Sequence, residues 1–196
     1  MEKFEVYEGT TVPIMNNNID TDQLIPKQFL KAVDKDSFGK NLFFNWRYLN
    51  DDYELNPDFA LNNPMYQSAS LLVTGDNFGS GSSREHAVWA LTGYVFKAVI
   101  AGSFSDIFYN NSLKNGLLPI TASLSTREAL AQLDPHIKLT VDLPNQLVSA
   151  GDIQFSFDID QTEKYKLVNG LDDIGITLQH LDAIKAYEKN RPAYWL

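Results

Sequence analysis

The central part of the chain alternates between short apolar runs and segments with helical periodicity. Residues 69–74 form an apolar run typical of a buried strand, and residues 83–97 place Val88, Leu91 and Val95 on roughly one face of a helix. The pattern continues with a strand, a helix and a short strand, at 98–102, 104–115 and 117–121. Residues 69–121 therefore predict a β-α-β-α-β unit with parallel strands and right-handed crossovers.

Strands are also predicted on both sides of this unit. Residues 4–14 alternate loosely between apolar and polar positions, and residues 137–148 and 153–159 do so again around the turn residues Pro144-Asn145. The sequence contains no internal repeat and no composition typical of a linker. We therefore expect one mixed α/β domain over residues 1–196.

Helices and a long loop complete the expected organisation. Pro26 can open a short helix that carries Phe29, Leu30 and Val33. Residues 34–66 lack periodicity and contain the helix- and strand-breaking pairs Asp51-Asp52, Asn56-Pro57 and Asn63-Pro64. They therefore predict a long loop, and such a loop in a compact domain is often functional. Two more helices are expected, one from the capping box Ser125-Thr126-Arg127-Glu128 through Leu133 and a closing one over 177–189.

A glycine-rich segment joins the strand at 69–74 to the helix at 83–97. It reads Gly75-Asp76-Asn77-Phe78-Gly79-Ser80-Gly81-Ser82-Ser83-Arg84-Glu85-His86. Ligands bind at such corners of open α/β sheets, because the free N–H groups of the helix attract an anion. An arginine there suits a carboxylate, which it can bind at two points. The segment is neither a Walker A loop nor a lipase-type nucleophile elbow. A plain alternative is that Ser82 to Glu85 only form a capping box.

Composition excludes several classes of function. The chain has 196 residues, of which 44% are hydrophobic and 21% charged, as in an ordinary globular protein. Its net charge of −9, with no basic run, argues against nucleic acid. No apolar stretch reaches the roughly 20 residues that span a bilayer, and the first residues do not look like a signal peptide. The absence of cysteine fits a cytoplasmic protein.

Several motifs together resemble a known family. The glycine-rich segment resembles the signature on the swivelling domain of the aconitase superfamily. The rest of the chain is similar to the small subunits of bacterial 3-isopropylmalate dehydratases, nearly end to end, in Asp20-Thr21-Asp22-Gln23-Leu24-Ile25-Pro26, Phe104-Ser105-Asp106-Ile107-Phe108, Asn115-Gly116-Leu117-Leu118-Pro119 and Ile176-Thr177-Leu178-Gln179-His180. The resemblance implies the swivelling β/β/α fold, with a mixed sheet.

The resemblance also implies an activity, a partner and a cofactor. The implied reaction converts 2-isopropylmalate to 3-isopropylmalate through isopropylmaleate, by dehydration and rehydration, in leucine biosynthesis. Aconitase-like enzymes use a [4Fe–4S] cluster, which is normally held by cysteine thiolates. This chain has no cysteine, and its three histidines show no metal-ligand spacing, so we expect the cluster on a separate large subunit and no metal here.

Other functions stay open from the sequence alone. A sibling hydro-lyase could use the same residues on homoaconitate, methylmalate or citraconate. A non-catalytic carboxylate-binding module would use Ser82, Ser83 and Arg84 only as an anion site. A serine hydrolase is disfavoured, since no pattern of histidine and aspartate partners accompanies the serines.

The resemblance assigns roles to individual residues. Ser82 matches the catalytic base, which acts as an alkoxide, and Ser83 and Arg84 match residues that bind substrate carboxylates. Asp22 matches a carboxylate that reaches the active site and can orient or balance a catalytic group. We favour Asp22 over Asp20, because either one can also be a plain helix cap.

Further site residues are predicted around these. Arg47 could bind the second carboxylate of the substrate, and the apolar Phe29 and Leu30 could contact its isopropyl group. We expect Arg127 to be a solvated helix residue. Structural roles are expected for His86, Asp106, Asn110, Asn111 and Lys114.

Overall fold

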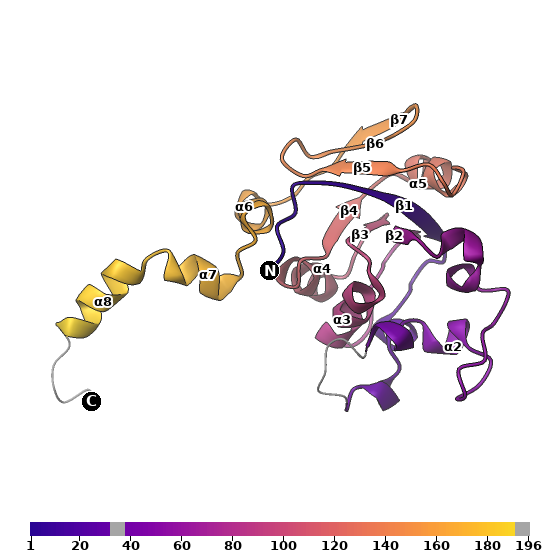
Figure 1. The fold of residues 1–196 in the computed structure, drawn as a ribbon, viewed down its shortest axis with the longest axis horizontal. Helices are drawn as coiled ribbons and strands as arrows, with labels where there is room; N and C mark the ends of the chain where they lie inside the picture. Colours follow the sequence, from indigo (N-terminus) through magenta and orange to yellow (C-terminus); the bar gives the residue numbers. More distant parts are fainter. Residues whose placement is uncertain (32–37, 191–196) are drawn as a thin grey trace.

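A seven-stranded mixed sheet organises the chain (Figure 1). The computed structural model describes residues 1–31 and 38–190. The strand order is β4-β3-β2-β1-β5-β6-β7, with β1 to β4 parallel and β5 to β7 antiparallel. The strands are β1 (Val6–Ile14), β2 (Ala69–Thr74), β3 (Ala98–Ala101), β4 (Leu118–Thr121), β5 (Leu139–Asp142), β6 (Leu147–Ala150) and β7 (Ile153–Ser156). This mixed sheet confirms the predicted fold class.

The predicted β-α-β-α-β unit forms one side of the sheet, from the edge strand β4 to β2. Helix α3 (Glu85–Tyr94) connects β2 to β3, and α4 (Asp106–Lys114) connects β3 to β4. All six residues of β2 are buried, as expected for a parallel strand covered on both faces. Leu72 packs in one core with Leu91 of α3, and its neighbour Val73 packs in the other core with Leu130 of α5 (Leu124–Ala131).

Residues 38–66, predicted as a long loop, contain very short helices between turns and contribute to the core. Phe38, Leu42 and Phe43 are fully buried, and the ring of Phe43 stacks on Trp46 at 5.3 Å between centroids. Aromatic burial in very short helices leaves no periodicity to detect, because each helix is about one turn long. These helices are η3 (Gly39–Asn41), α2 (Phe44–Arg47), η4 (Ala60–Asn62) and η5 (Pro64–Tyr66). Residues 34–37 of the predicted loop lie outside the described residues.

Two short helices precede this segment. Helix α1 (Thr21–Leu24) was not predicted, and it starts at Asp20, whose side chain accepts from the Gln23 amide. The helix predicted after Pro26 is only a 3-10 turn, η1 (Lys27–Phe29), and Val33 lies outside the described residues. Four-residue helices depend on their caps and tertiary contacts rather than on propensity, so the sequence pattern does not reveal them.

The C-terminal region leaves the body of the molecule. Helix α6 (Gln161–Asn169), which was not predicted, packs through Leu167. The closing helix predicted over 177–189 is two helices, α7 (Asp173–Leu178) and α8 (Leu181–Lys189), which extend away from the sheet (Figure 1). We call residues 173–190 the C-terminal arm. Neither of its helices contains a buried residue.

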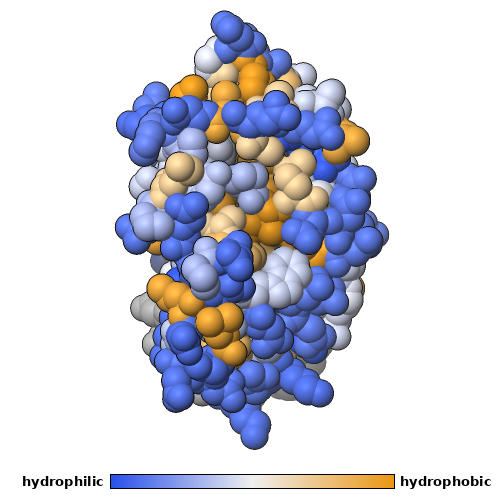
Figure 2. Space-filling view, turned by 90° about the vertical axis from the view of Figure 1, so that its right-hand side faces the viewer, coloured by the Kyte–Doolittle hydropathy of each residue, from blue (hydrophilic) through white to orange (hydrophobic). Residues whose placement is uncertain are grey.

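The opposite end of the molecule presents a different surface. Seen from that end, hydrophilic residues surround scattered hydrophobic ones and a hollow with an apolar floor (Figure 2). Exposed apolar residues of the 38–66 segment are Leu49, Leu55 and Met65. Across the ranges 1–31 and 38–190, no helix combines the length and the apolarity needed to cross a membrane.

Candidate active site

The glycine-rich loop after β2 is held by the two segments beside it. Four successive amides, those of residues 76–79, donate to Asn17 Oδ1, Ser103 Oγ, the Ser103 carbonyl and the Ile19 carbonyl, at 2.7, 2.8, 2.9 and 2.7 Å. Gly79 has a φ of +73°, and a Cβ there would lie 2.1 Å from the Phe108 ring. Only glycine fits this position, which brings the loop against α4.

The serine-rich end of the loop does not form the capping box that its sequence allows. Helix α3 begins at Glu85, its N-cap is Arg84, and no side chain caps it. Ser82 and Ser83 are exposed ahead of the helix, and the Ser82 carbonyl accepts a bond of 2.9 Å from the Thr21 hydroxyl. The Ser82 side chain therefore has no capping role.

A cavity of about 220 Å³ lies at this corner. Ser82 and Arg84 line it from the loop, and Ser105, Asp106 and Asn111 line it from α4 and its N-cap. Ser105 caps α4 and donates to the Gly79 carbonyl at 2.6 Å. The amino ends of α3 and α4 thus meet at one cavity, an arrangement that favours an anion.

Two residues of this cavity were assigned structural roles from the sequence. Asp106 and Asn111 line the cavity, although they were expected to be structural. A signal was available, because Asp106 begins the helix that follows β3, and the carboxyl ends of parallel strands share one edge of a sheet. The corner after β3 is in this respect equivalent to the glycine-rich corner after β2.

Arg84, which lines the cavity, forms an ion pair with Asp22, which does not. The Arg84 side chain is 15% exposed and that of Asp22 is 54% exposed. Asp20 instead forms a capping box with Gln23, in which the two reciprocal bonds measure 2.7 and 2.8 Å. The two aspartates therefore have different contacts in the structure. Asp20 caps α1, and Asp22 contacts Arg84 of the loop.

Arg47 lies away from this cavity. Its guanidinium donates to the carbonyls of Gly39 and Lys40 and stacks 4.7 Å from the centre of the Tyr94 ring. Tyr94 ends α3, whereas Arg84 precedes its first residue. The structure of this chain therefore does not bring Arg47 to the other candidate residues, and its role as second carboxylate anchor stays a prediction without support from the geometry.

Phe29 and Leu30 also lie outside the cavity lining. Both are half-buried and pack on the core, and the Phe29 ring lies 4.7 Å from that of Phe44. Their contact with a substrate stays a prediction.

His86 packs between Phe38 and Trp89, at 5.3 and 4.7 Å between ring centroids, in keeping with the structural role expected for it.

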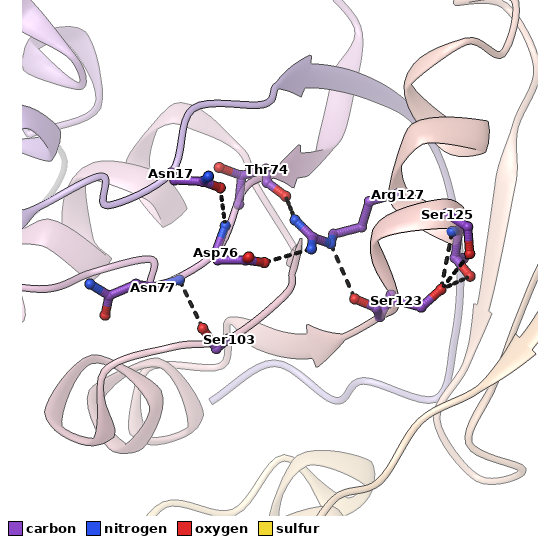
Figure 3. A network of polar contacts seen from close by, with 10 residues as sticks. Asn17, Thr74, Asp76, Asn77, Ser103, Ser123, Ser125 and Arg127 are labelled. Atoms are coloured by element: carbon purple, nitrogen blue, oxygen red, sulfur yellow. Dashed lines mark hydrogen bonds and ion pairs between the residues drawn. The ribbon is translucent and has the colours of Figure 1, made fainter.

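Arg127 is not the solvated residue that the sequence predicts. It is 2% exposed, and its guanidinium reaches the carboxyl end of β2 below the glycine-rich loop (Figure 3). Helix α5, which carries it, is capped by Ser123 and not by Ser125. Arg127 lies three residues before the buried Leu130, so the helical period does place it on the inward face.

The chain does not fit a metal cluster. It contains no cysteine, and within the ranges 1–31 and 38–190 no three His, Cys, Asp or Glu side chains gather as a metal site would require. An iron–sulfur cluster needs thiolate or comparable ligands, so these residues could not hold one.

Comparisons with known proteins decide the family. Residues 1–125 match the aconitase C-terminal domain, and residues 173–195 match the C-terminal domain of the 3-isopropylmalate dehydratase small subunit. The 3-isopropylmalate dehydratase small subunit of Lactococcus lactis subsp. cremoris is 65% identical over 189 residues, covering 96% of this chain and 98% of the relative. That of Streptococcus sanguinis is 62% identical and covers 100% of both chains. The chain belongs to the family of 3-isopropylmalate dehydratase small subunits.

A solved structure of this family supports the fold. The crystal structure of 3-isopropylmalate dehydratase from Methanocaldococcus jannaschii has a TM-score of 0.68, with 23% identity, over 93% of this chain and 99% of that one. The family resemblance and the fold expected from it are thus confirmed. The roles of the individual site residues stay predictions.

Proposed function

We propose that this chain is the small subunit of a hydro-lyase that isomerises 2-isopropylmalate to 3-isopropylmalate, through isopropylmaleate, in leucine biosynthesis. The observation that carries the proposal is the cavity at which Ser82, Arg84 and the amino ends of α3 and α4 meet. Its volume of about 220 Å³ is below the roughly 300–1,000 Å³ of pockets for drug-sized ligands and suits a small organic acid.

In this proposal Ser82 removes the carbon-bound proton of the substrate and returns a proton in the second half of the reaction. A serine hydroxyl is a very weak acid, so its alkoxide needs positive potential nearby. The helix ends at the cavity and the Arg84 guanidinium supply such potential. The lack of a capping bond from Ser82 supports this role, because the hydroxyl is not committed to the helix.

Arg84 binds a substrate carboxylate, with Ser83 beside it on the exposed part of the loop. A guanidinium has five N–H donors in a planar fork, so its pairing with Asp22 leaves donors for a second carboxylate. Asp22 thereby orients Arg84 toward the cavity.

The remaining chemistry comes from a large subunit in this proposal. Taking up the substrate hydroxyl requires a Lewis acid, which a [4Fe–4S] cluster on the large subunit would supply. The chain has no cysteine, and no group of metal-ligating side chains gathers within residues 1–31 and 38–190, so in this proposal its part is the binding of carboxylates and the transfer of the carbon-bound proton. A cytoplasmic location also belongs to the proposal, in keeping with the absence of cysteine.

The C-terminal arm supports an assembly of two different subunits. Ile174 and Tyr187 are 70% and 71% exposed, and Leu178 and Leu181 are exposed as well. Apolar side chains repeated along a projecting helix pair are typical of a surface that a partner covers. The arm coincides with the segment matched as the C-terminal domain of the small subunit, which favours the large subunit over a second copy of this chain.

Two other functions compete with this one. A sibling hydro-lyase acting on homoaconitate, methylmalate or citraconate would use the same cavity, and the position of Phe29 and Leu30 away from the cavity provides no argument for an isopropyl group. A carboxylate-binding module would bind the acid without turnover.

Reconstitution separates these functions. The chain is mixed with a purified large subunit whose cluster is assembled, and hydration of isopropylmaleate is compared with that of citraconate and homoaconitate. We expect turnover of isopropylmaleate only when both chains are present. Faster turnover of another acid would assign a sibling activity, and binding without turnover would leave only the binding module.

A further inference from the structure

Arg127 is a buried cation whose donors point to three different elements (Figure 3). Its Nε donates to the Ala122 carbonyl at 3.1 Å, one Nη to the Thr74 carbonyl at 2.9 Å, and the other to Asp76 Oδ1 at 2.6 Å. Thr74 ends β2 and Ala122 follows β4. One side chain therefore fixes the carboxyl ends of two strands and the first part of the glycine-rich loop.

The lack of a side chain at Gly102 leaves the space that this ion pair occupies. A Cβ on Gly102 would lie 1.7 Å from Asp76 Oδ1 and 2.4 Å from an Nη atom of Arg127. The Gly102 amide in turn donates to the Gly75 carbonyl at 3.1 Å. Glycine at position 102 thus lets the end of β3 approach the loop without displacing the ion pair.

Asp76 connects Arg127 to the rest of the loop, because both its side chain and its backbone are hydrogen-bonded. While its carboxylate binds Arg127, its amide donates to Asn17 Oδ1 and its carbonyl accepts from the Asn18 amide at 2.8 Å. The next three amides are bonded to neighbouring segments, and the loop then reaches Ser82 in the cavity. A shift at Asp76 would move the backbone that leads to Ser82.

We propose that the Arg127–Asp76 ion pair is a positioning device that sets the place of Ser82 and Arg84 for the reaction. The inference rests on the proposed function, and it adds two residues that the reaction itself does not touch. Its physical basis is that a displacement of about 1 Å at reacting groups can cost roughly 100-fold in rate. A purely structural ion pair would instead affect only the stability of the chain.

Asp76→Ala is the informative variant, because it removes the carboxylate and leaves Arg127, whose side chain is 3% exposed, with only its two carbonyl acceptors. The loss of the buried pair should also lower the melting temperature, so thermal unfolding is measured beside the kinetics. In the complex of both chains we expect kcat to fall roughly 10- to 100-fold with KM nearly unchanged. Asp76→Asn keeps an oxygen acceptor and should restore most of the kcat. Glu2→Ala is the matched control, since it breaks an ion pair with Lys97 on the surface.

Hydrogen exchange in the isolated chain gives a second readout that needs no partner. Asp76→Ala should speed exchange of the amides of residues 77–79 while leaving those of β5 and β6 unchanged. Normal kcat in Asp76→Ala, or unchanged exchange in the loop, would overturn the inference. Failure of the unmodified complex to hydrate isopropylmaleate would reject the proposed function instead, and the exchange comparison would still decide whether this ion pair holds the loop.

Discussion

The glycine-rich loop and the C-terminal arm differ in how firmly the rest of the chain holds them. In the loop, four successive amides are bonded to neighbouring segments, and the buried Arg127 anchors its start. The helices of the arm contain no buried residue, and Lys166 ties the arm to α6 through Asp173 at 2.8 Å. The backbone of the loop is therefore fixed by its neighbours, whereas the side chains of the arm remain exposed on a projecting surface.

This difference separates two kinds of mutational effect. A substitution in the loop should change turnover in a complex that still assembles, because the loop lies against the cavity. A substitution on the apolar face of the arm should change assembly in a chain that still folds. Variants in the two regions therefore test the comparison, and those in the loop should have the stronger effects.

Ser82→Ala should have the largest effect on turnover. Loss of the base should lower kcat by at least about 1,000-fold, while the melting temperature of the isolated chain stays unchanged because Ser82 caps no helix. Steady-state kinetics of the complex and thermal unfolding of the chain measure both quantities. Ser156→Ala, on the exposed end of β7, is the control. A lower melting temperature with normal kcat would mean that Ser82 only supports the loop.

Arg84→Lys should damage catalysis although it keeps the charge. A lysine cannot reproduce the planar fork that contacts Asp22 and a substrate carboxylate together. We expect a loss of about 100-fold in kcat/KM, or roughly 2.7 kcal/mol. Kinetics of the complex would test this, with Asp22→Asn expected to show a smaller loss. Near-normal values for Arg84→Lys would remove Arg84 from the site.

Charges on the apolar face of the arm should weaken assembly. In Leu178→Asp/Leu181→Asp, the affinity for the large subunit should fall at least about 10-fold, because buried charges oppose association. The melting temperature of the isolated chain should change by no more than about 2 °C, since both side chains are exposed. Calorimetric titration of the large subunit measures the affinity.

Ala186→Asp is the matched control for this pair of substitutions. Ala186 is exposed on α8 and lies two residues after Ile184 and five after Leu181, and therefore on the side of the helix away from its apolar residues. The added charge there should leave the affinity unchanged. Equal weakening by all of these variants would indicate a general charge effect and would contradict a specific interface on the apolar face.

The response of the arm to acid should be weaker than any of these effects. The hydrogen bond from Lys166 holds the pKa of the Asp173 carboxyl below its ordinary value. A lowered pKa means that the ionised form stabilises the fold above pH about 3.9 and that this contribution is lost as the pH falls through the lowered value. NMR shifts of the α7 amides between about pH 6 and pH 2 should report the loss, and Asp173→Asn should abolish that response.

The sequence predicted the parts of the fold whose signal is long and periodic. The strand at 69–74 matches β2, and the helix expected over 104–115 contains α4, because burial on both faces of a strand and on one face of a helix leaves a clear pattern. One-turn helices such as α1 and α2 leave no such pattern. Their positions depend on contacts with distant residues, as in the buried aromatic side chains of residues 38–66.

The candidate site followed the same division. Ser82 and Arg84 could be proposed from the sequence because a glycine-rich loop at a strand-to-helix corner has a local signature, and the structure places both at one cavity. Asp106 and Asn111 were not assigned to the site, because no local motif marks them, although they line the same cavity as Ser82 once β2 and β3 pair. Arg127 was placed in solvent because its charge outweighed its position on the inward face of α5, and only the fold shows that its donors have partners.

The central position of β1 has a consequence for how the chain is made. Residues Thr10–Ile14 pair with β2, but Val6–Gly9 pair with β5, which is translated only after residue 138. At a translation rate of about 5–20 residues per second, β5 is synthesised on the order of ten seconds after β1. During this time the first half of β1 has no strand to pair with. Unpaired strand edges promote aggregation. We therefore expect the nascent chain to be most prone to aggregation before β5 to β7 have been translated.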